Sequence, residues 1–348
     1  MLSSKPRSWL YLVLRVGGSV LILSLLLHFL PLEQLRRALG RLPPGLWLFV
    51  LAGYLSAHSI GVLKWRLMVN LAGAHLTLAQ AGRCYFGGLF GTLFLPSILG
   101  GDIIRLGLAM RLARNRLGAL LGSVIDRILD VTALGSVAAF GAVLLPGALS
   151  PQHREIFWLL VCSGILALAI LLAVVALVPA RRFSYRTRRG FVRLRQAARS
   201  MAREPQYVLL ALGLGVAVQT SFVLLTAVIA AGCGLYLPLR VWLFAWSLAK
   251  ISSVLPVSQG GIGVRELALA ALAAPFGAPP ALTVAVGLAW EAIILVGGLL
   301  AGLLSFLLGR SAGLRSAPAG FPASNGSKTN ESTQRKVSSR KSVPKTGL

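Results

Sequence analysis

The chain has 348 residues, of which 56% are hydrophobic and 13% charged, and its formal net charge is +26. Apolar runs near the roughly 20 residues that cross a bilayer exclude an ordinary soluble domain and indicate an integral membrane protein. The basic residues lie largely between and beyond these runs, as in cytoplasmic loops that face anionic lipid, so the charge does not indicate nucleic acid binding. The cysteines and histidines lack the spacing of a metal site or disulfide framework, so we expect neither metal nor cofactor.

Six apolar runs are long enough for full spans. The first follows two basic residues as a signal peptide would, but it is too long for an h-region and lacks a small-residue cleavage site, so we expect a retained span. The arginine-rich loop 181–203 and the basic tail predict that both termini lie in the cytoplasm, with Lys64 in a cytoplasmic loop and Trp65 in an interfacial aromatic belt. The expected spans are residues 9–30, 43–63, 117–147, 156–179, 206–232 and 280–308.

Two further apolar segments, residues 83–110 and 239–277, are broken by proline and glycine. Each has two halves too short to cross a bilayer comfortably, which predicts a re-entrant helical hairpin. PSILGGDIIR from Pro96 and PVSQGGIGVR from Pro256 share one pattern, and in the expected span order the two hairpins open to opposite sides. This predicts an inverted repeat with halves of about 31–155 and 200–310. Two unrelated helix breaks are the alternative.

The expected fold class is therefore an all-α polytopic membrane helix bundle, with about six full spans and two broken hairpins in residues 1–310. Residues 311–348 are rich in Ser, Lys, Pro and Gly, which predicts a disordered basic cytoplasmic tail.

Acidic residues are rare in the chain, yet several fall in or next to apolar segments. At roughly 3 kcal/mol for each charge at the bilayer midplane, five unpaired acids would cost about 15 kcal/mol. They therefore need partners, for which Arg105, Arg127, Lys250 and Arg265 are the natural candidates. The five acids are Asp102, Asp126, Asp130, Glu266 and Glu291.

Helical spacing predicts how some of these charges meet. Asp102 and Arg105 share a helix face, as do Arg127 and Asp130. Asp126 and Asp130 also share a face, so they either recruit a cation or leave one acid protonated. The network is either purely structural or also serves a substrate or proton path.

The glycine-rich break after Pro256 predicts a helix that stops and a second that begins near Gly261. The free amides of the new helix and Arg265 suit a phosphate or other anion, and Gly-Gly-Asp with Arg105 repeats the design. A hinge without ligand is the alternative. We expect no catalytic residue, and the candidate substrate-binding residues are Gly100, Gly101, Asp102, Arg105, Asp126, Arg127, Asp130, Gly260, Gly261, Arg265, Glu266 and Glu291.

Four motifs resemble the lysylphosphatidylglycerol synthase transmembrane-region family, also called UPF0104 or flippase-like. They are KWRLMVN at 64–70, LPSILGGDIIR at 95–105, SVIDRILD at 123–130 and LPVSQGGIGVRE at 255–266. The family usually has Glu-Arg where this chain has Asp126 and Arg127, and Pro-Gly where it has Pro96 and Ser97.

This resemblance implies a multi-pass protein of the inner (plasma) membrane, some of whose relatives flip aminoacylated phospholipids. The synthases carry a large soluble transferase domain after the membrane region, whereas this sequence continues into a short basic tail, so we expect no aminoacyltransferase activity. A lipid translocase for phospholipids or polyprenyl-linked lipids, with a polar central cavity and membrane lipids with anionic headgroups as partners, is the leading interpretation. An intramembrane lipid-modifying enzyme using Asp126, Asp130, Glu266 or Glu291, and a non-catalytic membrane scaffold, remain alternatives.

Overall fold

Every residue that the computed structural model describes belongs to a helix or to a connection between helices. The described residues are 32–94, 98–145, 203–252 and 263–315, with a few more between 192 and 199. These ranges contain no strand, which confirms the all-helical fold class. The expected spans at 9–30 and 156–179, and the tail beyond Arg315, lie outside the described residues.

The first group of helices runs from residue 32 to residue 143. Pro44 opens the second helix, at a position where no amide donor is needed. Thr77 and Gln80 cap the third by exchanging hydrogen bonds between their side chains and amides. The helices are α2 (Leu32–Gly40), α3 (Pro44–Leu71), α4 (Leu78–Gly91), α5 (Ile98–Leu112) and α6 (Arg116–Val143).

The second group repeats the order of a long helix, two short helices and a long helix. Pro205 opens the first long helix as Pro44 does in the first group. The elements are α9 (Pro205–Gly232), α10 (Leu239–Ser252), α11 (Val264–Ala273) with the 3-10 turn η3 (Ala274–Phe276), and α12 (Pro280–Arg315).

Both broken segments form pairs of short helices. α4 and α5 have 14 and 15 residues, and α10 and α11 have 14 and 10. At about 1.5 Å of rise per residue, none of them reaches the roughly 30 Å of a hydrocarbon core. The two helices of each pair pack against each other. Gly263, just before α11, has a φ of 83°, which a residue without Cβ adopts readily.

Three helices of the described chain are long and apolar enough to cross a membrane: Pro44–Leu71, Pro205–Gly232 and Pro280–Arg310. α6 has 28 residues, as many as α3 and α9, but it carries Asp126, Arg127 and Asp130 near its middle. Many large apolar side chains of these helices, such as Phe49, Leu209 and Leu299, are exposed. Exposed leucine and phenylalanine on long apolar helices are expected where the surrounding medium is lipid.

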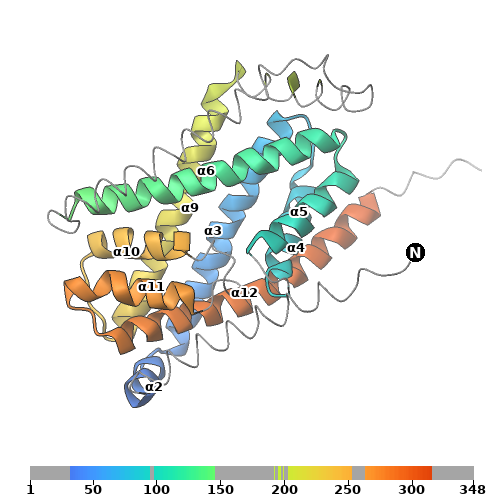
Figure 1. The fold of residues 1–348 in the computed structure, drawn as a ribbon. Coiled ribbons are helices and arrows are strands. Elements are labelled where there is room, and N and C mark those ends of the chain that lie inside the picture. The colour runs from blue at the N-terminus through green and yellow to red at the C-terminus, as the bar shows by residue number, and fades with distance from the viewer. Residues whose placement is uncertain are drawn as a thin grey trace, which may run out of the picture.

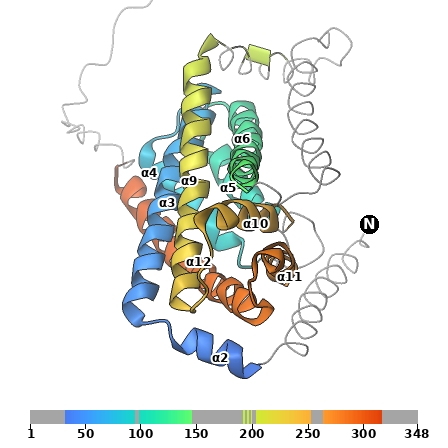
Figure 2. The same cartoon turned by 90° about the vertical axis from the view of Figure 1, so that its left-hand side faces the viewer.

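The long helices α6 and α12 each contact both α3 and α9, at different levels of the bundle (Figure 1). α3 and α9 pack side by side and run in opposite directions (Figures 1 and 2). α4 packs mainly against α12, and α10 packs against α6, so each short pair is covered by the last long helix of the other group. α4 and α5 consequently lie at one end of the bundle, and α10 and α11 at the other (Figure 1).

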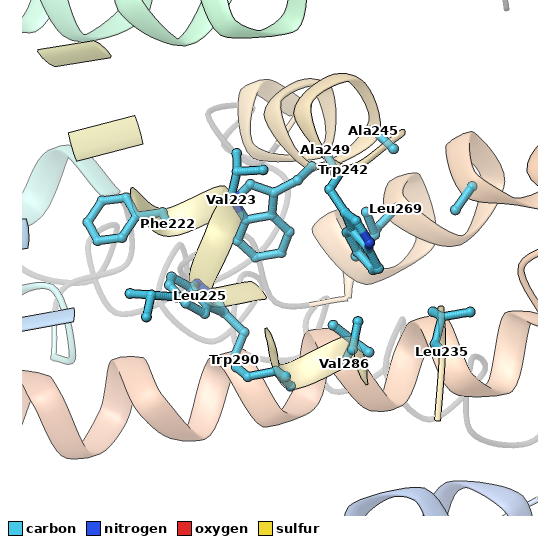
Figure 3. Close-up of a cluster of buried hydrophobic side chains, with 14 of the residues drawn as sticks. Phe222, Val223, Leu225, Leu235, Trp242, Ala245, Ala249, Leu269, Val286 and Trp290 are labelled. Atoms are coloured by element: carbon cyan, nitrogen blue, oxygen red, sulfur yellow. The ribbon is translucent and has the colours of Figure 1, made fainter. Parts of the chain in front are cut away.

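The largest buried cluster joins α9, α10, α11 and α12. Phe222, Trp242 and Trp290 project into it together with Leu269 and Val286 (Figure 3). The aromatic side chains fill the space between the crossing helices and hold α10 and α11 against the two long ones.

One expected boundary is wrong. α3 continues to Leu71, eight residues beyond the expected end of the span, so Lys64 and Trp65 lie within the helix rather than in a loop. Both side chains are buried, and Trp65 is fully inaccessible, so it is a core residue and not part of an interfacial belt.

Candidate functional site

Charged side chains from three helices meet inside the bundle and form the first charge cluster. It contains three cations and three anions: Lys64 from α3, Asp102 and Arg105 from α5, and Asp126, Arg127 and Asp130 from α6.

Lys64 lies between two carboxylates of α6. Its Nζ is 2.5 Å from Asp126 Oδ1 and 2.9 Å from Asp130 Oδ1. Asp126 is fully buried and Lys64 is 2% exposed. Of the two outcomes that the sequence left open for this acidic pair, the structure shows the contact with a cation, and that cation is Lys64, which was expected in a loop.

Arg105 links α5 to α6 and to the aromatic interior. Its Nη2 is 2.9 Å from Asp102 Oδ1, as the helical spacing predicts, and 3.5 Å from Asp126 Oδ2. The guanidinium lies over the rings of Trp65 and Tyr85, at 5.3 and 5.4 Å from their centroids. Such stacking stabilises a desolvated guanidinium.

Arg127 does not pair with Asp130 as the shared helix face suggests. Its Nε lies 3.5 Å from Asp102 Oδ2, so it bridges α6 to α5 instead. The side chains of Asp102, Arg127 and Asp130 keep 29%, 32% and 22% exposure, whereas Lys64 and Asp126 are buried. The cluster thus has a sealed inner side and an accessible outer side.

Three buried atoms of this cluster have no hydrogen-bond partner within the described chain: Asp102 Oδ2, Arg105 Nε and Asp126 Oδ2. Buried polar atoms are normally satisfied, so these atoms retain capacity for a water molecule or a polar ligand group.

Gly100 and Gly101 are buried near the start of α5. A Cβ at Gly101 would lie 2.6 Å from the carbonyl oxygen of Gly88 on α4. Close approach of the two helices therefore explains Gly101, and anion binding by these amides stays a prediction. Gly260 and Gly261 lie outside the described residues.

The second charge cluster consists of Arg265, Glu266 and Glu291. Arg265 Nη2 donates to Glu266 Oε1 at 2.8 Å and to Glu291 Oε2 at 2.6 Å. Glu266 Oε2 accepts the amide of Gly263 at 2.7 Å, so the carboxylate of Glu266 itself occupies the start of α11 where the sequence predicted a bound anion. Arg265 and Glu266 are 5% and 0% exposed.

A chain of aromatic rings joins the two clusters. Tyr85, which lies beneath Arg105, contacts His58 through a 3.3 Å hydrogen bond. Trp246, beneath Arg265, packs edge-on against Trp290 with ring centroids 5.2 Å apart. Between these ends lie Tyr54, His58, Phe222 and Trp290, with centroid distances of 4.4 to 5.9 Å between neighbours.

Lys250 of α10 lies between the clusters. Its Nζ donates to Gln219 Oε1 at 2.8 Å and lies 4.3 Å from the centroid of Phe222. Its charge acts on Asp130 and Arg127 of the first cluster and on Arg265 of the second. With Lys250 included, five basic and five acidic side chains lie in this part of the described interior.

Sequence reasoning missed Lys64 and the aromatic chain. The stretch KWRLMVNL holds mostly apolar residues and no helix breaker before Gly73, which was a signal that the helix continues. No comparable signal identifies Tyr54 or His58, because they touch the clusters only through tertiary packing.

Long apolar helices around buried ion pairs define an integral membrane protein with a charged interior. Among the described residues, no group of three or more His, Cys, Asp or Glu side chains is arranged to hold a metal ion. The chain belongs to the lysylphosphatidylglycerol synthase TM region family, whose family model matches residues 12–302. This confirms the resemblance drawn from the four motifs. No curated protein gives a significant match.

Proposed function

We propose that this protein moves the polar headgroup of a phospholipid or polyprenyl-linked lipid across the plasma membrane. The observation that carries the proposal is the pair of charge clusters joined through the protein interior by aromatic side chains and Lys250. Buried charges in a membrane interior are expensive, and they are commonly kept where a polar solute has to pass. The acyl chains would stay in the bilayer while the headgroup exchanges with the ion pairs.

We propose that the two groups form an inverted repeat, which would suit this function. Each helix contact in the first group has a counterpart in the second: α4 with α5 and α10 with α11, α5 with α6 and α11 with α12, α4 with α12 and α10 with α6. α3 and α9, the first helices of the two groups, run antiparallel and contact each other (Figure 2). Oppositely oriented halves that meet at a central polar site are the architecture of many transporters.

Similar side-chain contacts occur in the two groups, although their offsets differ: Arg265 follows Arg105 by 160 residues, and Glu291 follows Asp130 by 161. α9 and α10 begin 161 residues after α3 and α4, and the same offset relates Tyr85 to Trp246. In the first group Arg105 lies over Tyr85 and pairs with Asp126 of the next long helix. In the second, Arg265 lies over Trp246 and pairs with Glu291 of the next long helix. Each half therefore supplies one arginine, one aromatic ring and one acid.

In the proposed topology both termini are cytoplasmic, the α4–α5 pair enters from the cytoplasm and the α10–α11 pair from the exterior. The accessible charges Asp102, Arg127 and Asp130 would then meet the headgroup first on one side. An anionic or zwitterionic headgroup could pair there with an arginine through its negative charge and with a carboxylate through any positive charge. We propose transport rather than aminoacyl transfer, because ion pairs and aromatic rings can bind and exchange charged groups.

A headgroup-accessibility assay in vesicles reconstituted with the purified protein tests the function. Fluorescent lipids in the inner leaflet become accessible to a membrane-impermeant quencher when they are moved outward. We expect Arg265→Ala and Asp102→Ala to slow this movement at least about tenfold, which corresponds to about 1.4 kcal/mol. Arg111→Ala, an exposed arginine on the same helix as Arg105, is the control and should match the wild type. Equal rates for all variants would reject the site.

A further inference from the structure

The two charge clusters differ in charge balance. In the first, three cations face three anions, because Lys64 lies between Asp126 and Asp130. In the second, one guanidinium serves two carboxylates, and its Nη2 donates to both Glu266 and Glu291. The residue 161 positions after Lys64 is Leu225, a buried apolar side chain of α9, so the second half has no lysine at that place.

Hydrogen bonding distinguishes the two carboxylates of the second cluster. Both oxygens of Glu266 accept hydrogen bonds, from Arg265 and from the amide of Gly263. Glu266 is fully buried at the start of α11. Glu291 accepts one hydrogen bond on Oε2, and its Oε1 accepts none from the described residues.

The accessibility of the two carboxylates also differs. The side chain of Glu291 keeps 14% exposure, whereas that of Glu266 is fully covered. Within the described residues, Glu291 is therefore the carboxylate of this cluster that has both an oxygen without a hydrogen bond and contact with the outside.

Among the described residues, Glu291 forms an ion pair with no cation other than Arg265. On α11 they are Arg265 and Glu266, and on α3 the neutral hydroxyl of Tyr54 lies within range of its charge. α9 contributes no charged residue, and α4 contributes Arg83, which lies beside Gly309 nearer the end of α12. Lys250 of α10 acts on Asp130, Arg127 and Arg265 and donates to Gln219.

A buried polar atom without a hydrogen-bond partner among the described residues also lies in the helix beside this cluster, and it indicates that a polar molecule can bind there. Trp246 Nε1 is buried and has no hydrogen-bond partner within the described chain. Its ring centroid lies 5.5 Å from Cζ of Arg265, the arginine that donates to Glu291, and an unsatisfied buried polar group at such a place can bind a water molecule.

We infer that Glu291 carries an exchangeable proton. If the proposed function holds, uptake and release of this proton accompany the movement of the headgroup. Glu291 Oε1 takes a proton from water on one side, which leaves Arg265 paired with the single charge of Glu266. Loss of the proton to the other side restores two carboxylates on one guanidinium, and no bond between heavy atoms changes. Two carboxylates sharing one cation in a medium of low polarity favour such a shared proton.

Infrared difference spectroscopy of the purified protein in lipid nanodiscs tests the proton without any transport assay. We expect the carbonyl band of a protonated carboxylic acid, shifted in D₂O, to change with pH in the wild type. It should be lost in Glu291→Gln, and it should persist in Glu291→Asp and in Glu33→Gln, which removes an exposed carboxylate of α2. An unchanged band in Glu291→Gln would overturn the assignment of the proton to Glu291. A wild-type protein that shows no such band and binds sodium at this site would overturn it too.

A second measurement addresses coupling. In vesicles with an imposed pH gradient, the rate of headgroup movement by the wild type should change at least threefold when the gradient is reversed. The rate of Glu291→Gln should stay the same. Movement that ignores the gradient in the wild type would overturn the coupling. Absence of any headgroup movement in the wild type, with the infrared band present, would reject the proposed function and leave the proton site standing. Monodisperse elution and wild-type thermal unfolding of each variant exclude misfolding as the cause.

Discussion

Lys64 shows how much a single buried charge can organise. It joins α3 to α6 through two carboxylates and a further 3.4 Å contact with the backbone oxygen of Asp126. A buried ion pair adds little over an apolar pair of the same shape, but removal of one partner leaves an uncompensated charge. The contacts of Lys64 add little stability in themselves, but loss of the lysine would leave the carboxylates of Asp126 and Asp130 without a cation.

We predict that Lys64→Met lowers the free energy of unfolding by about 3–5 kcal/mol, because Asp126 and Asp130 then face each other without a cation. Reversible unfolding in mixed micelles measures it. Asp126→Asn added to Lys64→Met should recover part of the loss, with a coupling energy of about 0.5–3 kcal/mol. Arg111→Met, at an exposed position, should change stability little, and a Lys64→Met protein as stable as the wild type would contradict the structural role of the pair.

The charged residues could be predicted from sequence because few acids occur in this chain and apolar context makes them conspicuous. The ion-pair partners of these residues could be predicted only where both residues lie close together in sequence on one helix. Asp102 and Arg105 share a face, whereas Lys64 meets Asp126 across 62 residues of sequence. A lysine at the end of an apolar run has the same neighbours in sequence whether it contacts lipid headgroups or an acidic residue of another helix. The positive-inside rule therefore placed Lys64 in a loop, although it lies inside α3.

At the scale of the element, the short helices depend on glycine for their close packing. Gly88 and Gly101 meet where α4 and α5 approach, and a Cβ on Gly88 would lie 2.8 Å from the carbonyl oxygen of Gly101. The backbone itself occupies the space that a side chain would need. This contact fixes the position of α5, which carries Asp102 and Arg105 of the first charge cluster.

We predict that Gly101→Ala destabilises the protein by about 1–3 kcal/mol, since α4 and α5 must separate to admit the methyl group. Gly107→Ala on the same helix is the matched control, because a Cβ there meets nothing within 4 Å. This control should be neutral or stabilising by up to about 1 kcal/mol through its effect on helix propensity. Thermal unfolding in detergent compares the two, and equal shifts for both variants would argue against the close contact.

The short helices themselves were predictable, since proline and glycine interrupt apolar runs too short to cross. α4 and α5 extend the expected segment 83–110 by five residues at its start and two at its end. The long-range exchange of partners, α4 with α12 and α10 with α6, was not predictable. It depends on side-chain fit between helices far apart in sequence, which no local pattern encodes.

At the scale of the whole molecule, the arrangement of the two groups makes a prediction about sidedness. In the proposed topology the connection after α9 is exterior and the connection between α5 and α6 is cytoplasmic. Tyr236 is 80% exposed in the first connection, and Arg114 is exposed in the second.

We predict that a membrane-impermeant maleimide labels Tyr236→Cys in intact cells, and labels Arg114→Cys only after permeabilisation. The native cysteines are replaced first, and Cys84 and Cys233 are buried in the structure. Labelling of both positions from the same side would contradict the inverted arrangement, while leaving the fold unaffected.

The exchange of partners between the two groups also constrains how the protein is made. α4 and α5 leave the ribosome well before α12, the helix against which α4 packs most extensively. During that interval the first hairpin and its charges lack the helix that covers them in the folded protein. The packing of α4 against α12 can therefore be completed only after α12 has been translated.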